Sequence, residues 1–202
     1  MGNNLTPVVL IADLLGISLR SADTLLSSRS PSVSLRAFAR RLADGEVNHP
    51  LVNRVARSRL KAMFDLQVLM SEECLNFAGS AFNWEELQHY LIEMLDGRVR
   101  ETFVGLFFNG RNELIARETL FIGSTRSAFV DPGVVLTRAL SHQAASVVVA
   151  HNHPSGSIVP SQADIEMTRK LARCLKLVDI ALTDHIIVAA GRCESLRNLG
   201  FV

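Results

Sequence analysis

The feature that most constrains this chain is an apolar run that leads directly into a polar loop. SVVVA (146–150) has three consecutive valines, which is typical of a strand buried on both faces of a sheet. HNHPSGSIVPSQAD (151–164) follows at once and brings two histidines, two prolines, a glycine and an aspartate. We therefore expect a buried strand that ends at a histidine pair and turns back into a helix.

The polar loop contains the side chains of a metal site. In an extended chain, residues i and i+2 point to the same face, so His151 and His153 would project together. Ser161 and Asp164 fall on the first turn of a helix expected from about Ser161 to Leu177. Two imidazoles and a carboxylate suit catalytic zinc, which keeps one position open for water. The same Ser-x-x-Asp spacing is also a capping box that needs no metal, so both interpretations stay open.

The C-terminal part of the chain predicts alternating strands and helices. ETFVGLFF (101–108) and ELIARETLFI (113–122) predict two strands, and Asn109-Gly110 between them is typical of a type I′ hairpin turn. A helix is expected to begin at Asp131-Pro132, and DIALTDHIIVAAG (179–191) predicts one long final strand. The order β-β-α-β-α-β indicates an α/β fold with a mixed sheet and flanking helices. Within the last strand, one residue of Asp184-His185 could contact the metal site from behind the ligands. A structural histidine in the core is the commoner case.

A small all-helical N-terminal region is predicted over residues 1–75. Apolar residues recur at intervals of three and four in PVVLIADLLGI, SLRAFARRLA and LVNRVARSRLKAMFDLQVLM. The Ser/Pro-rich stretch SSRSPSVS separates the first two helices, and Ser34 is the expected N-cap of the second. NFAGSAF (76–82) predicts a linker. Residues 83–202 are predicted as the second domain, which opens with a helix capped by Asn83.

The spacing in the polar loop matches a known signature. His-x-His, seven residues, Ser, two residues, Asp is the motif of JAMM (MPN+) metalloproteases, and His151, His153, Ser161 and Asp164 fit it without a gap. The block from SHQAASVVVAHNHPSG to DHIIV resembles the RadC-like subgroup, and the resemblance covers about residues 82–202. It implies a JAMM/MPN-like fold and one Zn²⁺ per chain, held by His151, His153 and Asp164, with no other cofactor.

The resemblance also implies an upstream glutamate as general base. Glu101 stands at the matching place, where the first helix of the domain leads into its first strand; Glu118 is the rival, and Glu113 fits a solvated strand end. Glu101 would activate the attacking water, and Ser161 would donate a hydrogen bond to the developing oxyanion. The implied reaction is hydrolysis of a peptide or isopeptide amide bond in a peptide or protein substrate.

Charge leaves a second class of function open. The net charge is +1, which gives no overall attraction to nucleic acid, but Arg36–Lys61 holds seven basic and two acidic residues. That segment is either a solvated helix face or a phosphate-contacting surface. RadC-like proteins usually carry an N-terminal helix-hairpin-helix with a GIG-type turn, yet Gly45 is the only glycine between Gly16 and Gly79. A DNA-associated protein with a non-catalytic or structural metal centre is thus the alternative, and a metal-dependent nuclease is a third.

The remaining expectations concern location and assembly. Three cysteines without a CxxC spacing favour a reducing compartment. Neither a membrane-spanning run nor a signal peptide is recognisable, so we expect a cytoplasmic protein without a membrane partner. The helical region is a candidate docking or dimerisation module, which leaves a homo-oligomer open.

Overall fold

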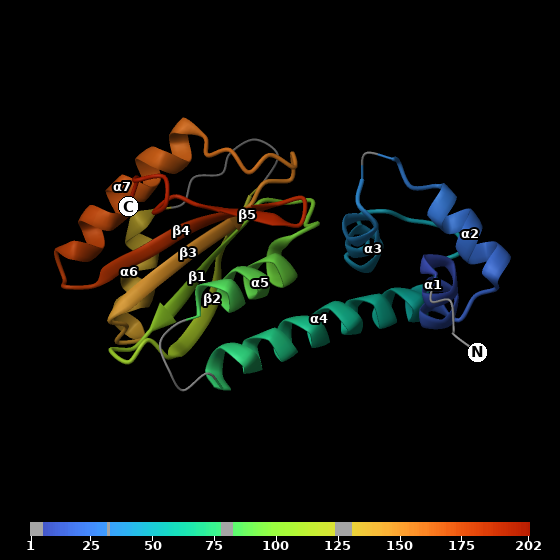
Figure 1. Cartoon of the computed structure of the whole chain (residues 1–202), viewed down its shortest axis with the longest axis horizontal. Helices are drawn as coiled ribbons and strands as arrows, with labels where there is room; N and C mark the ends of the chain where they lie inside the picture. Colours follow the sequence, from blue (N-terminus) through green and yellow to red (C-terminus); the bar gives the residue numbers. More distant parts are fainter. Residues whose placement is uncertain (1–5, 32, 78–82, 124–130) are drawn as a thin grey trace. The chain divides into compact units, whose positions relative to one another are not determined.

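The computed structural model describes residues 6–31, 33–77, 83–123 and 131–202 (Figure 1). These residues form seven helices and five strands, and the chain divides into two compact units, Met1–Val68 and Leu69–Val202. The predicted fold, an α/β domain with a mixed sheet preceded by a helical region, is confirmed. The predicted domain boundary at residue 75 lies within a continuous helix that extends to Phe77, and residues 78–82 of the predicted linker lie outside the described residues.

The first unit is helical. It contains α1 (Pro7–Leu15), α2 (Leu19–Ser27), α3 (Leu35–Ala43) and the first part of α4 (Arg54–Phe77). The hydroxyl of Ser34 accepts a hydrogen bond from the Ala37 N–H, so Ser34 caps α3 as predicted. Helix α2, with its N-cap at Ser18, was not predicted as a separate element. The buried residues of this unit include Leu15, Leu25, Phe38, Leu42, Leu60 and Phe64.

Much of the basic segment is engaged within the first unit. The guanidinium groups of Arg36 and Arg40 lie over the ring of Phe64, at 5.7 and 4.4 Å from its centroid. Two further arginines donate hydrogen bonds within the unit, Arg57 to the Asn48 side chain and Arg59 to the Leu14 carbonyl. These four side chains therefore contribute to the packing of the helices and not only to a charged surface.

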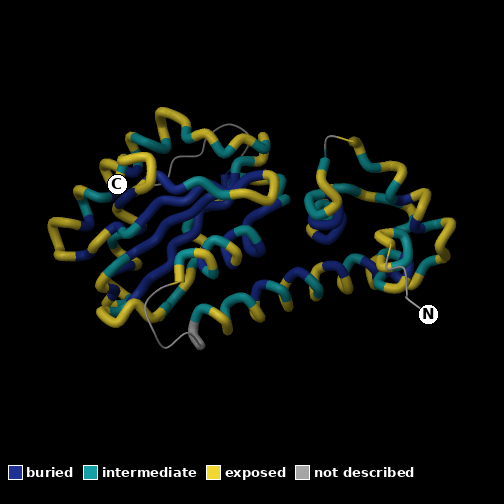
Figure 2. Tube along the Cα trace, in the orientation of Figure 1, coloured by how far each residue is buried: buried dark blue, intermediate teal, exposed yellow. Residues whose placement is uncertain are grey.

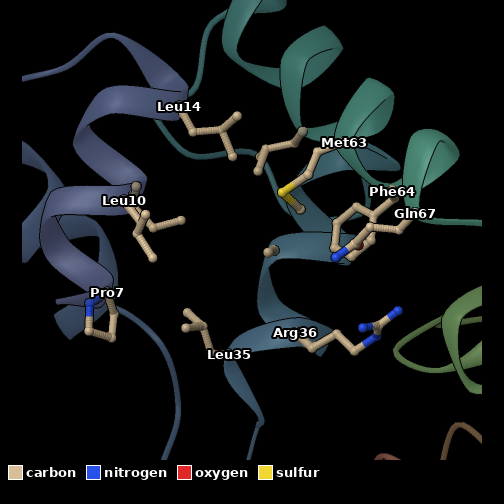
Figure 3. A pocket seen from close by; sticks show the side chains of 11 residues that line it. Pro7, Leu10, Leu14, Leu35, Arg36, Met63, Phe64 and Gln67 are labelled. Atoms are coloured by element: carbon tan, nitrogen blue, oxygen red, sulfur yellow. The ribbon is translucent and has the colours of Figure 1, made fainter. Parts of the chain in front are cut away.

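An apolar pocket of about 470 Å³ opens in this unit between α1, α3 and α4 (Figure 3). Its wall is formed mainly by aliphatic and thioether side chains, with the Phe64 ring and the polar ends of Arg36 and Gln67 at one side. The labelled residues Pro7, Leu10, Leu14, Leu35 and Met63 come from all three helices.

The second unit is built on a five-stranded sheet of order β2-β1-β3-β4-β5. Strands β3 and β4 are parallel, and the other three neighbouring pairs are antiparallel. Two of the three interior strands, β1 and β3, are buried over almost their whole length, which explains their apolar sequences (Figure 2). The bounds are β1 Thr102–Phe108, β2 Leu114–Ile122, β3 Ser146–Asn152, β4 Ala181–Ala189 and β5 Arg192–Ser195.

Helices cover both faces of this sheet (Figure 1). Helix α5 (Trp84–Leu95) contacts β3, β4 and β5 on one face, and α6 (Pro132–Ser141) and α7 (Gln162–Lys176) pack together on the other. Alternate residues of β3, Val147 and Val149, join Leu171 and Leu175 of α7 in the core of the second face. His151 is the next residue in that alternation, so the core pattern directs it toward α7.

One predicted turn and one predicted strand differ in the structure. The hairpin between β1 and β2 forms, but the type I′ turn is wrong: Asn112, not Gly110, has a positive φ of 62°. The side-chain oxygen of Asn109 instead accepts hydrogen bonds from the backbone N–H groups of Arg111 and Glu113.

The prediction of a single final strand is also wrong, because the chain reverses at Ala190 and Gly191 into β5. Both residues have positive φ. Because alanine rarely adopts that conformation, the turn could not be recognised from the sequence.

Among the helices of the described residues, none is both long and apolar enough to cross a membrane.

Candidate metal centre

The histidine pair lies at the end of β3, as its sequence pattern requires. His151 is 1% exposed and faces the α7 side of the sheet. The His153 N–H donates to the Val188 carbonyl at 3.0 Å, which continues the pairing with β4 and keeps the chain extended. The chain then turns at Gly156, whose φ of 84° favours glycine. Both imidazoles therefore project from the end of β3 toward the first turn of α7.

Helix α7 brings the carboxylate to the same space. Ser161 is its N-cap, and Asp164 is its third residue. Asp164 lies on the helix face that carries Thr168, Leu171 and Leu175, which are all fully buried. The apolar periodicity that docks α7 on the sheet thus also directs Asp164 toward the histidines.

The three side chains converge with dimensions that suit zinc. His151 Nε2 lies 2.9 Å from His153 Nε2 and 3.2 Å from Asp164 Oδ1, and His153 Nε2 lies 3.5 Å from Asp164 Oδ2. In a tetrahedral zinc site, ligand atoms bonded at their usual lengths are about 3.3 Å apart. Within the described residues, this is the one cluster of histidine, cysteine and acidic side chains whose spacing would allow a metal ion. The donor set therefore fits a Zn²⁺ ion with a fourth position left open.

The Asp164 carboxylate belongs to both the capping box and the histidine cluster, and its Oδ2 contacts both. Oδ2 accepts hydrogen bonds from the Ser161 N–H at 2.8 Å and from the Ser161 hydroxyl at 2.6 Å. The Asp164 N–H in turn donates to the Ser161 hydroxyl oxygen at 3.2 Å, which completes a capping box. Oδ1 is the oxygen nearer to His151. The two interpretations of Ser161 and Asp164 are therefore compatible, because the capping box orients the carboxylate that would bind the metal.

Replacement of Ser161 by alanine is expected to lower the free energy of unfolding by about 1 kcal/mol, since the helix loses its cap. Chemical denaturation of the full chain measures the change. Ser157→Ala in the same loop is the matched control, because the Ser157 hydroxyl accepts only a local hydrogen bond from the Val159 N–H. Equal stabilities of the two variants would show that the capping box contributes nothing.

The charges of the cluster stabilise one another. Burial raises the pKa of Asp164, but hydrogen bonds from His151 and His153 outweigh it and hold that pKa well below its ordinary value. The hydrogen bond to Asp164 raises the pKa of His153, against the effect of burial. Glu101 contributes to this rise through its negative charge. The cluster thus favours positive charge at its centre.

Glu101 lies close to the cluster but is not one of its members. It precedes β1 directly, two residues before Phe103, whose ring stacks on His151 with centroids 5.9 Å apart. Its backbone oxygen accepts a hydrogen bond from the Gly123 N–H at 2.7 Å. Among the described residues, the group spaced for direct metal binding comprises the two histidines and Asp164 alone. Glu101 is therefore a neighbour of the cluster whose charge acts on His153, but it is not one of the three clustered side chains.

The rival glutamates have other partners. Glu118 on β2 accepts hydrogen bonds from Arg138 and lies 2.6 Å from His142 Nε2. The hydrogen bond from Arg138 is the main reason that the pKa of Glu118 is lowered. Glu113 accepts a hydrogen bond from the Asn109 side chain at 2.6 Å at the hairpin. His142 at the end of α6 is thus a partner of Glu118.

Two neighbours of the ligands were not assigned from the sequence. For His185 the sequence leaves a contact with the site open but favours a core role; its Nε2 lies 2.8 Å from His151 Nδ1. Asn152 sits between the two histidines with its side chain on the opposite side of the strand. Its Oδ1 accepts from the Thr102 N–H at 2.8 Å, and its Nδ2 donates to the carbonyls of Arg98 and Arg100. Asn152 thereby holds the segment that contains Glu101.

Comparison with known proteins agrees with this geometry. A family model described as a RadC-like JAB domain matches residues 82–201. A UPF0758 protein of Cupriavidus pinatubonensis is 43% identical over 143 residues, 71% of this chain and 63% of that protein. A UPF0758 protein of Acidovorax sp. is 48% identical over 118 residues, 58% of this chain and 50% of that protein.

A third relative matches almost the whole chain. A UPF0758 protein of Xanthomonas campestris pv. campestris is 35% identical over 203 residues, 98% of this chain and 89% of that protein. The chain spans only about half to two thirds of the length of the first two relatives. The chain belongs to the RadC-like JAB domain family.

Proposed function

We propose that this chain is a zinc-dependent metallohydrolase that cleaves a peptide or isopeptide amide bond, with one Zn²⁺ per chain. The observation that carries the proposal is the convergence of two imidazole nitrogens and one carboxylate group: the nitrogens lie 2.9 Å apart, and they lie 3.2 and 3.5 Å from the two oxygens of Asp164. The proposal also places the protein in the cytoplasm, where its three free cysteines would stay reduced.

His151, His153 and Asp164 would hold the ion. Bound there, Zn²⁺ would supply a Lewis acid that lowers the pKa of water and polarises a carbonyl group. The remaining steps belong to side chains of the protein. The Glu101 carboxylate would accept a proton from the attacking water and give it to the leaving amine nitrogen. The Ser161 hydroxyl is exposed, and it would turn from Asp164 Oδ2 to donate to the developing oxyanion.

The proposed substrate is a peptide or a protein. A peptide or protein fits the proposed reaction, because the site lies at the protein surface between the end of β3 and the start of α7, where Ser155, Ser157 and Val159 are exposed. The alternative of a DNA-associated protein draws no added support from the first unit, where four of the seven basic side chains contact their own unit.

Amide hydrolysis tests the proposal, with Glu101→Gln as the decisive variant. Zinc-loaded and chelator-treated full-length chains are incubated with a library of quenched fluorescent peptides and with a lysine-linked isopeptide, and products are identified by mass spectrometry. We expect cleavage by the zinc-loaded chain only. Glu101→Gln should retain zinc and lose at least about 100-fold in rate, since it can no longer act as a base.

Two controls make the result specific. Glu113→Gln should leave the rate unchanged, because Glu113 bonds to the hairpin residue Asn109. Glu118→Gln, which loses its contacts with Arg138 and His142, should affect hydrolysis far less than Glu101→Gln. Undiminished hydrolysis in Glu101→Gln would remove Glu101 from the mechanism, and failure of the zinc-loaded chain to cleave any member of the library would contradict an amide hydrolase.

A further inference from the structure

A third histidine, His185 on β4, lies behind the proposed ligands. It is 0% exposed. Its Nδ1 is 2.6 Å from the Thr168 hydroxyl on α7, and its Nε2 is 2.8 Å from His151 Nδ1. The Thr168 hydroxyl also lies 2.6 Å from the main-chain oxygen of Asp164, one helical turn earlier. A continuous chain of hydrogen bonds thus links Asp164, Thr168, His185 and His151.

The direction of each hydrogen bond in this chain follows from counting protons. The Asp164 carbonyl can only accept, so the single hydroxyl proton of Thr168 must be donated to it. With that proton used, the Thr168 oxygen can only accept from the third member of the chain. His185 therefore carries a proton on Nδ1 and donates it to Thr168.

The same count of protons assigns the hydrogen bond between His185 and the proposed metal ligand His151. A fully buried imidazole without a charged partner in this chain of hydrogen bonds is neutral and holds one proton, because an unpaired buried charge is costly. Since that proton is on Nδ1, His185 Nε2 has a free lone pair and accepts from His151 Nδ1–H. A neutral His151 is thereby held in the tautomer whose Nε2 is unprotonated and faces the cluster.

His153 reaches the same tautomer by a shorter route. Its Nδ1 lies 2.7 Å from the Ser157 carbonyl, which can only accept, so Nδ1 carries the proton. When both rings are neutral, as metal binding requires, two unprotonated Nε2 atoms face each other at 2.9 Å. Neither can donate to the other, and a cation between them satisfies both lone pairs.

We infer that Thr168 and His185 are positioning residues that fix the tautomer and ring orientation of His151 for metal binding. The inference rests on the proposed function only in taking the bound cation to be zinc. Because Thr168 is on the same helix as Asp164, the hydrogen-bond chain also couples the third ligand to the first. Partners of this kind behind metal-binding histidines typically contribute about 10–100-fold to metal affinity.

Zinc affinity of four variants, measured by competition with a chromophoric chelator, tests the inference. His185→Leu removes the acceptor for His151 and should weaken zinc binding about 10–100-fold. His185→Gln places an amide oxygen near the position of Nε2 and should restore affinity to within about threefold of the unsubstituted chain, since the hydrogen bond from His151 is kept. Thr168→Val, of nearly the same size, should weaken binding in the same direction as His185→Leu.

Thr137→Val is the matched control. The Thr137 hydroxyl on α6 donates to the carbonyl four residues earlier, as that of Thr168 does, but it lies on an exposed part of the helix without a histidine partner. This variant should bind zinc like the unsubstituted chain. Circular dichroism and thermal unfolding establish that each variant is folded, and the Gln and Val variants serve if His185→Leu does not fold.

Imidazole ¹⁵N chemical shifts give a second readout that needs no metal. His185 should show the neutral tautomer protonated at Nδ1 in the unsubstituted chain, and Thr168→Val should shift it toward the other tautomer. A chain that binds no zinc would end the proposed function, whereas the His185 tautomer would still test the hydrogen-bond chain. Zinc binding that is equally tight in His185→Leu, or a His185 protonated at Nε2, would overturn the inference and leave the metal centre in place.

Discussion

Zinc is expected to be absent from a chain in which His151 and His153 are both replaced by alanine, whereas the unsubstituted chain carries about one ion. Two of the three ligands are lost, and one carboxylate that is also engaged in a capping box cannot hold the ion alone. Elemental analysis of freshly purified protein measures the difference. Equal zinc in both proteins would falsify the site.

The same variant should lose stabilisation by zinc. An ion that binds only the folded chain adds about 4 kcal/mol to the free energy of unfolding when its free concentration is 1,000 times the dissociation constant. Thermal unfolding with and without added zinc should therefore separate the unsubstituted chain from the double variant. His89→Ala, at an exposed position of α5, is the control and should respond to zinc like the unsubstituted chain.

The ligand geometry could be predicted because the residues that form the core also orient the ligands. Val147 and Val149 must face the core, and period-two alternation then directs His151 to the same side. Leu171 and Leu175 fix the buried face of α7, and helical periodicity puts Asp164 on it. Both patterns are local, so they can be recognised without any knowledge of which elements are neighbours.

The partners of the ligands could not be predicted, because they depend on how the strands align. His185 reaches His151 only because β3 and β4 pair in parallel with Val149 opposite His185. That pairing includes a register shift between Val147 and Val148, which cannot be recognised from a local sequence pattern. A histidine in an apolar strand has the same appearance in the sequence whether it supports a ligand or merely fills the core. The register, a long-range property, decides between the two.

Asn152 is the second partner of this kind, and its replacement by alanine should have a large effect on stability. It is 2% exposed, and its side chain satisfies the Thr102 N–H and the carbonyls of Arg98 and Arg100. Truncation leaves these backbone groups without their partner, at a cost of about 1–3 kcal/mol for each one that water cannot reach. We expect the free energy of unfolding to fall by about 3 kcal/mol, measured by urea denaturation.

Asn152→Ala should also separate hydrolysis from metal binding. Glu101 lies between Arg100 and Thr102, both tied to Asn152, so loosening this segment displaces the proposed base while the three ligands keep their own supports. Zinc content should therefore remain near one ion per chain as the rate of peptide hydrolysis falls. Asn152→Asp keeps the acceptor for the Thr102 N–H but places a carboxylate against two carbonyl oxygens, so it should be at least as unstable. Asn198→Ala, at an exposed site, is the control. If Asn152→Ala matched it in both stability and hydrolysis, the segment before β1 would be held by other contacts.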